Sequence, residues 1–208
     1  MSISIIGAGN VGMALGKAFT QRGEAVVFGV RDPAAYAAEV AKLGPRASVA
    51  TNAEAIAASG VVILAIPYAA VAAVARSLAD WGGRILVDAT NPLAPDLSGL
   101  TVGTTTSGAE ELAKLARGAR VVKAFNTTGA ENMADTSYAN GTPFMPVCGN
   151  DAEARSSVIA LAASIGFDAV DCGELVAARY LEPFAMTWIL MAIKLGMGRR
   201  FAFARLQR

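Results

Sequence analysis

The sequence contains no histidine and only two cysteines among its 208 residues. Without histidine, the commonest general base and the commonest metal ligand are missing, so no metal site is expected. Cys148 and Cys172 lie far apart in the chain and form no metal-binding or redox motif. Sparse, unclustered cysteine is typical of reducing compartments, so we expect a cytoplasmic protein.

The sequence also lacks an excess of charge of either sign. The formal net charge is +1, and no block of Lys or Arg precedes the last few residues, so nothing indicates a nucleic-acid partner. The apolar start, Ser2 to Ile6, runs into glycines without the basic region of a signal peptide.

Long hydrophobic runs are missing too. The most apolar stretch, Pro183 to Ile193, is only 11 residues between Glu182 and Lys194, too short to cross a bilayer. We interpret it as part of a terminal helix, 177–195, that is buried or forms a subunit contact. We therefore expect a homodimer and no membrane partner.

What the chain has in abundance is apolar residues, at 54%, arranged in short runs that alternate with Ala-rich helical stretches. Predicted strands are 2–6, 25–30, 48–50, 61–65, 85–89, 121–125, 145–148 and 168–171. Predicted helices are 11–21, 35–43, 53–58, 69–80, 110–116 and 152–165. The strands are almost continuously apolar, which is typical of a parallel sheet covered on both faces. The alternation predicts an α/β fold with a doubly wound, mainly parallel sheet.

One irregular segment, 91–106, is rich in Pro, Gly, Ser and Thr. It follows a predicted strand, so it should lie at the carboxyl edge of the sheet, where open α/β folds bind ligands. Ser107 with Glu110 three residues later has the pattern of a helix capping box, so we assign Ser107 a structural role.

The first strand runs into "GAGNVG", residues 7–12, a complete G-x-G-x-x-G. It follows a strand, opens a helix and is succeeded by a second strand, the context that a dinucleotide-binding turn requires. Gly7 allows the tight turn, Gly9 lets the backbone approach a pyrophosphate, and Gly12 allows close helix–strand packing. The pyrophosphate would meet the N–H groups at the helix start.

The end of the second strand discriminates NAD from NADP. NAD enzymes place Asp or Glu there to bind the ribose 2′-hydroxyl, but this strand ends in Gly29-Val30. Arg31 follows and can form charge-assisted hydrogen bonds to a 2′-phosphate. Asp32, followed by Pro33, is expected to start the next helix. NADP is therefore favoured.

The fourth strand ends in "AIPYAAV". Pro67 should end the strand and lead the chain past the ribose side of the cofactor. Tyr68 either packs on the cofactor or caps the core, and the sequence does not decide between the two.

Several segments together resemble a known family. They are "GAGNVG", "GVRDP", "AIPYAAV", "DATNPL", "TSGAEELA", "VVKAFNTTGAENM", "PVCGNDAEA" and "LEPFAMTWILMAIKLGMGRRFAF". In this order they resemble the NADPH-dependent oxidoreductases related to the reductase of coenzyme F420, an 8-hydroxy-5-deazaflavin. The cytoplasmic domains of animal metalloreductases, which reduce flavin with NADPH, are similar at a greater distance.

The resemblance implies a Rossmann-type NADP domain, residues 1–125, and a smaller part, 126–208, that completes the cleft for a second cofactor or substrate. By this resemblance, the dinucleotide phosphates are held by Ala8, Gly9, Asn10, Val11 and Arg31. The ribose and nicotinamide would lie near Ile66, Tyr68 and Ala130. The flavin or deazaflavin ring would be flanked by Asn91, Pro92, Pro146, Val147, Cys148 and Gly149, and the shared cleft bordered by Asn126 and Thr127.

The sequence departs from the family pattern at the 2′-phosphate position. Related chains commonly have Ser-Arg after the second strand, whereas Val30 precedes Arg31 here and offers no hydrogen-bond donor. A further basic residue in the next turn is also missing before Lys42. A weaker preference for NADP over NAD is therefore expected.

Hydride transfer from a nicotinamide to a flavin-type ring depends on parallel stacking more than on an acid–base residue. A histidine-free site suits this reaction. A reductase of small imines or carbonyls, similar to pyrroline-carboxylate reductases, is the alternative and would need a proton donor. Lys123 is the candidate for that role, although in a strand it can simply reach a neighbouring carboxylate. Asp88 and Glu182 are interpreted as structural residues and not as catalytic ones. A non-catalytic NADP sensor is the third interpretation.

Overall fold

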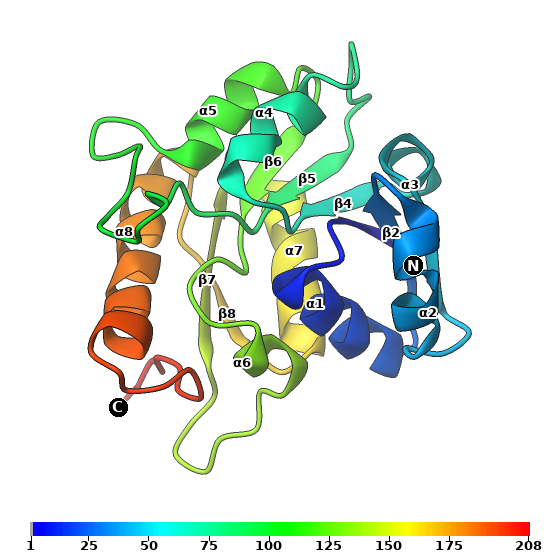
Figure 1. Ribbon diagram of the computed structural model, residues 1–208. Helices are drawn as coiled ribbons and strands as arrows, with labels where there is room; N and C mark the ends of the chain where they lie inside the picture. Colours follow the sequence, from blue (N-terminus) through cyan, green and yellow to red (C-terminus); the bar gives the residue numbers. More distant parts are fainter. Residues whose placement is uncertain (1) are drawn as a thin grey trace.

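The computed structural model describes residues 2–208 and has one eight-stranded sheet with helices on both faces (Figure 1). The strands are β1 (Ser2–Ile6), β2 (Ala25–Val30), β3 (Ala47–Thr51), β4 (Val61–Leu64), β5 (Ile85–Asp88), β6 (Arg120–Lys123), β7 (Phe144–Gly149) and β8 (Asp168–Asp171). The predicted doubly wound α/β class is confirmed.

The helices are α1 (Asn10–Gln21), α2 (Pro33–Ala41), α3 (Asn52–Ala58), α4 (Tyr68–Ala75), α5 (Gly108–Leu115), α6 (Glu131–Ala134), α7 (Ala152–Ser164) and α8 (Ala178–Ile189). A 3-10 turn, η1 (Leu175–Ala177), precedes α8, and a π-helix, η2 (Leu190–Lys194), follows it. The sequence did not predict α6, η1 or the π-helical end.

The strand order is β3-β2-β1-β4-β5-β6-β7-β8. The first six strands are parallel and have the order of a Rossmann sheet, with the switch point between β1 and β4. β7 runs antiparallel to β6, and β8 is parallel to β7. The predicted boundary at residue 125 falls just after β6, and β7 and β8 extend the same sheet.

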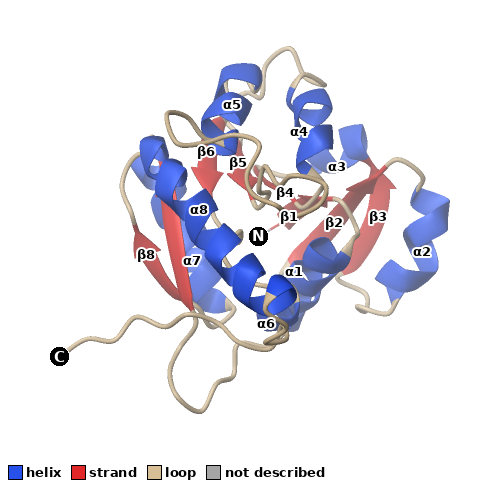
Figure 2. Ribbon diagram, turned by 60° about the vertical axis from the view of Figure 1, so that its left-hand side comes forward, coloured by secondary structure: helices blue, strands red, loops and turns tan. Residues whose placement is uncertain are grey.

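Two apolar layers cover the sheet. One contains Leu15 and Phe19 of α1 with Val158 and Leu161 of α7. The other contains buried residues of α3, α4, α5 and the start of α8. Figures 1 and 2 show this division, with α1 and α7 on one side of the sheet and α3, α4 and α5 on the other.

Among the predicted elements that end earlier than expected are a strand and a helix. The strand predicted to reach Phe125 stops at Lys123, because Phe125 adopts a left-handed φ of +60° that no strand contains. The helix predicted to reach Asp80 stops at Ala75. Its last carbonyls are bound by side chains: Ser77 Oγ donates to Val74 O, and Trp81 Nε1 donates to Ala75 O.

The terminal helical run, Leu175–Lys194, is longer than the sequence suggested. Its 20 residues have a mean hydropathy of 1.2, so by length and composition alone it could cross a membrane. In the folded chain, however, Glu182 and Trp188 are buried on one face of α8. Around Trp188 pack Leu93 and Leu97 of the irregular segment and Phe201 of the tail. These contacts anchor part of the run in the fold, while Tyr180, Leu190 and Ile193 stay exposed.

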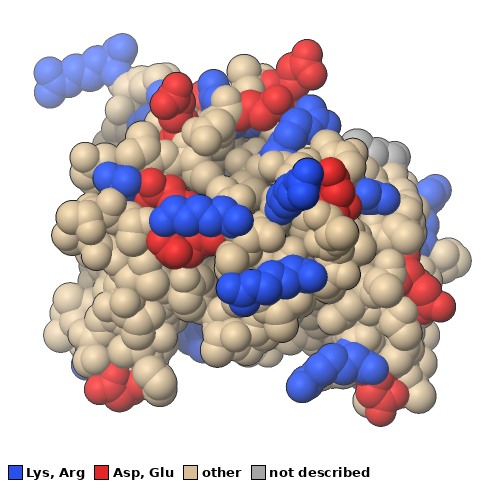
Figure 3. All heavy atoms as spheres, turned by 90° about the horizontal axis from the view of Figure 1, so that it is seen from above, with Lys and Arg blue, Asp and Glu red and all other residues tan. Residues whose placement is uncertain are grey.

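Charged side chains of both signs are mixed on the molecular surface seen from above (Figure 3). The view shows Lys and Arg interspersed with Asp and Glu, in keeping with the net charge of +1.

Candidate functional site

The glycine turn joins β1 to α1 at the switch point. Gly7 has a φ of +106°, and a Cβ there would lie 2.4 Å from the carbonyl oxygen of Ala65. A Cβ at Gly12 would lie 2.0 Å from Gly7 O. Glycine is therefore required at both positions, for the turn itself and for its packing on β4, as the sequence predicted.

Gly9 and the first turn of α1 are open toward a ligand. A Cβ at Gly9 would meet no atom within 4 Å, so the space beside this backbone is free. Gly9 is the N-cap of α1, no side chain caps the helix, and its first turn contains no acidic residue. The amides at this end therefore fit the pyrophosphate of a dinucleotide. Ala8 and Val11, on either side, pack against the core.

Arg31 extends from the end of β2 without a partner. Within residues 2–208 it forms no hydrogen bond or ion pair, and its side chain is exposed. Val30 is buried. Asp32 Oδ1 accepts a hydrogen bond from Ala34 N at 3.1 Å and caps α2, as predicted, so this carboxylate is engaged away from Arg31. A free guanidinium fits a phosphate substituent at this position.

The loops after β4 and β5 border the same edge. Ile66 Cγ2 lies 2.9 Å from the position that a Cβ at Gly7 would take, so it packs directly on the turn. Pro67 is exposed and starts α4. The ring edge of Tyr68 lies against the first residue of α5, Gly108.

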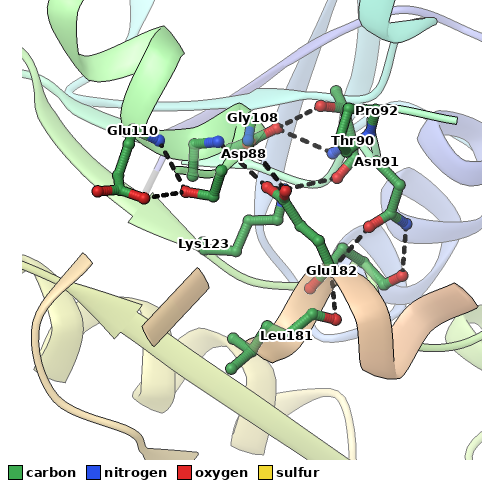
Figure 4. A network of polar contacts seen from close by, with 12 residues as sticks. Asp88, Thr90, Asn91, Pro92, Gly108, Glu110, Lys123, Leu181 and Glu182 are labelled. Atoms are coloured by element: carbon green, nitrogen blue, oxygen red, sulfur yellow. Dashed lines mark hydrogen bonds and ion pairs between the residues drawn. The ribbon is translucent and has the colours of Figure 1, made fainter. Parts of the chain in front are cut away.

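An amide pair links the loops after β5 and β6 to α8 (Figure 4). Asn91 Nδ2 donates to Asn126 O at 2.8 Å, and Asn126 Nδ2 donates to Asn91 Oδ1 at 3.0 Å and Leu181 O at 3.3 Å. Asn126 Oδ1 is buried and has no hydrogen-bond partner in the described chain. The structure thus brings Asn91 and Asn126 together, with Pro92 buried beside them.

The predicted residues of β7 are placed differently. Val147 and Cys148 are fully buried, Val147 in the layer of α1 and α7 and Cys148 in that of α4 and α5. Pro146 is buried, and Gly149 packs on β6, where a Cβ would lie 2.7 Å from Val121 O. The structure does not bring these side chains to the amide pair, and their contact with an acceptor ring stays a prediction.

The start of β7 does reach the site edge, which sequence reasoning missed. Because β7 is antiparallel to β6 and Cys148 pairs with Lys123, the last residue of β6, the first residues of β7 extend past the end of β6. Met145 Sδ accepts a hydrogen bond from Phe125 N at 3.1 Å, and Thr127 beside it is buried. Ala130, also buried, is the N-cap of α6. No sequence signal marks Met145, because the direction of β7 is not encoded locally.

Lys123 is buried completely beneath this edge and forms three hydrogen bonds (Figure 4). Its ammonium donates to Asp88 Oδ2 at 2.9 Å, Glu182 Oε1 at 2.9 Å and the carbonyl oxygen of Thr90 at 2.6 Å. Burial alone would lower the pKa of Lys123, but the two carboxylates outweigh it and raise the pKa. All three protons are committed, so Lys123 is a structural partner of carboxylates, one of the two roles that the sequence allowed.

The two carboxylates have further donors. Glu182 accepts hydrogen bonds from Gly108 N at 2.9 Å and Ala109 N at 3.1 Å, at the start of α5. Asp88 Oδ1 accepts from both the backbone and the hydroxyl of Thr90. Two carboxylates thus face one ammonium, and the positive end of the α5 dipole compensates the second negative charge.

α5 and α8 are also joined outside this network. Ser107 caps α5, accepting from Glu110 N at 3.2 Å, as predicted. Glu110 forms a two-pronged ion pair with Arg179 of α8, at 2.9 and 2.7 Å. The Arg179 guanidinium holds the pKa of Glu110 below its usual value.

Burial raises the pKa of the Cys148 thiol to about 12. The thiol is therefore protonated at neutral pH, as expected of a small buried residue and not of a redox cysteine. No group of three or more Cys, Asp or Glu side chains in residues 2–208 is arranged to hold a metal ion.

The tail 199–205 fastens α6, α8 and β7, which the sequence did not reveal. Phe201 O accepts from Asn132 Nδ2 at 2.8 Å and from Trp188 Nε1 at 2.9 Å, and the Phe201 ring stacks on Trp188. Phe203 O accepts from Phe144 N at 2.8 Å, and Arg205 pairs with Asp168.

The chain is similar to known proteins over most of its length. The profile of the family described as NADP oxidoreductase coenzyme F420-dependent matches residues 2–92. The F420-dependent NADP reductase of Methanothermobacter thermautotrophicus is 30% identical, over 93% of this chain and 90% of the relative. A solved structure from Arthrobacter sp. FB24, a candidate F420-dependent NADP reductase, has a TM-score of 0.87 and 31% identity, with both chains covered completely.

A third relative is much longer. The metalloreductase STEAP3 of Rattus norvegicus is 31% identical over 88% of this chain, but the match spans only 36% of the metalloreductase. The likeness therefore concerns about a third of that protein.

We predict that Lys123→Met lowers the free energy of unfolding at pH 7 by about 3–5 kcal/mol, because it leaves two buried carboxylates without their cation. Urea unfolding followed by circular dichroism measures this loss. The pKa of Lys123 is raised in the folded state. The stability that the Lys123 charge contributes is therefore complete below the unfolded pKa of about 10.4 and declines as pH rises through the folded pKa. The difference in the free energy of unfolding between Lys123→Met and wild type should therefore become smaller only in strong alkali.

The matched control is Lys114→Met. Lys114 pairs with Glu111 on the surface of α5, with 64% of its side chain exposed, so a change within about 0.5 kcal/mol is expected. Equal losses in the two variants would contradict the role assigned to the buried network.

Proposed function

Because the chain belongs to the family of coenzyme F420-dependent NADP oxidoreductases, we propose that it transfers a hydride between NADP(H) and a flavin-type or deazaflavin ring. The observation that carries the proposal is the pairing of an open, uncapped α1 start with the unpartnered Arg31 at the end of the neighbouring strand. These two features fit the pyrophosphate and the 2′-phosphate of one dinucleotide.

Each side chain of the site has a role in this proposal. The amides of the α1 start bind the pyrophosphate, Arg31 binds the 2′-phosphate, and Ile66 and Tyr68 border the nicotinamide half. NADPH supplies the hydride when it is bound. Asn91, Pro92 and Asn126 hold the edge against which the acceptor ring would stack. Free Cys148 and Cys172 agree with a reducing, cytoplasmic setting.

The state of Lys123 removes one support for a carbonyl or imine acceptor. Reduction of such a substrate needs a proton donor, and Lys123, the candidate that the sequence offered, has no N–H left to give. A non-catalytic NADP sensor would require little beyond the first 70 residues or so. Yet Asn91, Asn126 and Leu181, from three separate segments, are hydrogen-bonded at one edge, which supports a second ligand there.

We predict that the purified protein oxidises NADPH when FMN, FAD, riboflavin or the 8-hydroxy-5-deazaflavin is added separately, followed at the nicotinamide absorbance band. The control variant is Gly12→Val, whose side chain would collide with Gly7 O and close the turn, so both NADPH binding and oxidation should disappear. Reactions without protein give the background. Tight NADPH binding without turnover of any ring would refute the proposal.

We predict that Arg31→Ala weakens NADPH binding by about 10- to 100-fold, the loss of one or two charge-assisted hydrogen bonds, and changes NADH binding little. Quenching of intrinsic fluorescence measures both affinities. Arg22→Ala is the matched control. Arg22 is an exposed arginine at the C-terminal end of α1, and the 12-residue helix places it about 18 Å from the α1 start that binds the pyrophosphate. Equal losses for NADPH and NADH would mean that Arg31 does not read the 2′-phosphate.

We also propose that the protein is a homodimer that covers the exposed face of the terminal helical run. Eight large hydrophobic residues are exposed among residues 2–208. Four of them lie on this run, Val176, Tyr180, Leu190 and Ile193, and Leu195 and Met197 follow it directly. An apolar surface of this kind favours association with its own copy.

The predicted mass by light scattering is therefore about twice 21.3 kDa. The double variant Leu190→Asp, Ile193→Asp should shift it to one chain, because it charges the apolar face. Tyr36→Asp, which charges an exposed residue of α2, should not. A wild-type protein of one-chain mass would disprove the dimer.

A further inference from the structure

The hydroxyl group of Tyr68 takes no part in the hydrogen bonding within the described residues. The residue begins α4, directly after Pro67, and its ring is partly buried. Within the described part of the chain, its hydroxyl forms no hydrogen bond, although it lies near several charged groups. A partly buried phenol normally finds a partner, so one supplied by a ligand is the natural candidate.

The ring has a defined seat. A Cβ at Gly108 would lie 2.8 Å from Tyr68 Cε2, 3.2 Å from Glu182 Oε1 and 3.4 Å from Pro92 Cδ. Ring, carboxylate and proline therefore converge on the first residue of α5, where only glycine leaves room. These contacts hold the Tyr68 ring between the loops after β4 and β5. The proposed function assigns the acceptor ring to the same edge.

The surrounding charges keep the phenol protonated. Burial raises the pKa of Tyr68 first, and the carboxylates of Glu182, Asp88 and Glu111 raise it further, whereas Lys123 lowers it. These groups come from β5, α5, β6 and α8, and their charges sum to a negative value. Near neutral pH the hydroxyl is therefore a proton-bearing donor.

The other donors at this edge are already committed. Lys123 uses its three N–H groups on Asp88, Glu182 and Thr90. Asn126 Nδ2 donates to Asn91 and Leu181. Tyr68 therefore has an uncommitted donor at this edge, whereas Lys123 and Asn126 have none.

We propose that Tyr68 donates a hydrogen bond to the polar pyrimidine edge of the acceptor ring, where negative charge develops as the hydride arrives. The proposal rests on the proposed function. Hydride transfer breaks the nicotinamide C4–H bond and forms an N–H or C–H bond on the ring. Both electrons move with the hydrogen, so the nicotinamide becomes cationic and the ring gains one negative charge. The Tyr68 O–H bond stays intact, and a solvent proton neutralises the ring afterwards.

A donor in this position acts as an oxyanion-hole donor does: it is worth most when charge has formed. Asp88 and Glu182 are close enough to raise the pKa of Tyr68, so the phenol keeps its proton while negative charge forms on the ring.

The test compares Tyr68→Phe with wild type and with Tyr36→Phe, which removes the hydroxyl of an exposed tyrosine on α2. In single-turnover reactions, Tyr68→Phe should reduce riboflavin about 10²-fold more slowly, as expected for loss of such a donor. The NADPH dissociation constant should stay within about twofold, because the lost hydroxyl does not contact the dinucleotide phosphates.

A second readout needs no turnover. Riboflavin binding to the NADP⁺-loaded protein, followed by flavin fluorescence, should weaken about 3- to 10-fold in Tyr68→Phe and stay unchanged in Tyr36→Phe. Tyr68→Phe keeps the ring in its seat, and its circular dichroism and melting curve verify that it folds.

The outcomes separate this inference from the proposed function. If wild type reduces no ring, the proposed function fails, and this inference fails with it. If wild type reduces riboflavin and Tyr68→Phe matches it in rate and affinity, only the role of Tyr68 is overturned. A variant that loses NADPH affinity as strongly as ring reduction would place the hydroxyl on the dinucleotide and also overturn it.

Discussion

A lysine ammonium that is fully removed from water must replace its hydration shell with protein acceptors, and Lys123 does so with three of them. Its acceptors come from β5, from the loop that follows β5 and from α8. The geometry of one ammonium therefore fixes the distances among β6, the end of β5 and α8, which are remote in sequence. The carboxyl edge of the sheet takes its shape from this requirement.

The second carboxylate extends the constraint to α5. Since one ammonium cannot neutralise both Asp88 and Glu182, Glu182 also accepts the first amides of α5. This places Gly108 under the Tyr68 ring and α5 against α8, where Glu110 and Arg179 add a second link. The dinucleotide side of the site is independent of this network: the glycine turn and Arg31 are determined by β1, β2 and the start of α1.

That division explains what the sequence could predict. The roles of Gly7 and Gly12, the cap at Asp32 and the cap at Ser107 depend on neighbours within a few residues, so spacing alone identified them. Lys123 pairs with Asp88 and Glu182 across 35 and 59 residues, and a single sequence offers no signal for such pairs. The same holds for the direction of β7, which places Met145 against the backbone of Phe125 beyond the end of β6. The family resemblance predicted the fold and the cofactor class, whereas the hydrogen bond between Asn126 and Leu181 required the coordinates.

The hydrogen bonds to the carbonyl oxygen of Phe201 bear on the order in which the parts of the chain fold during synthesis. It ties α6 and α8 together through Asn132 and Trp188, and Phe203 and Arg205 bind the starts of β7 and β8 nearby. During synthesis these residues leave the ribosome after every element that they fasten. The first six strands and their helices can assemble earlier, because chains fold from the N-terminus as they emerge. The part of the fold that the tail fastens is thus the last to be completed, and a nascent chain acquires its glycine turn well before this part is in place.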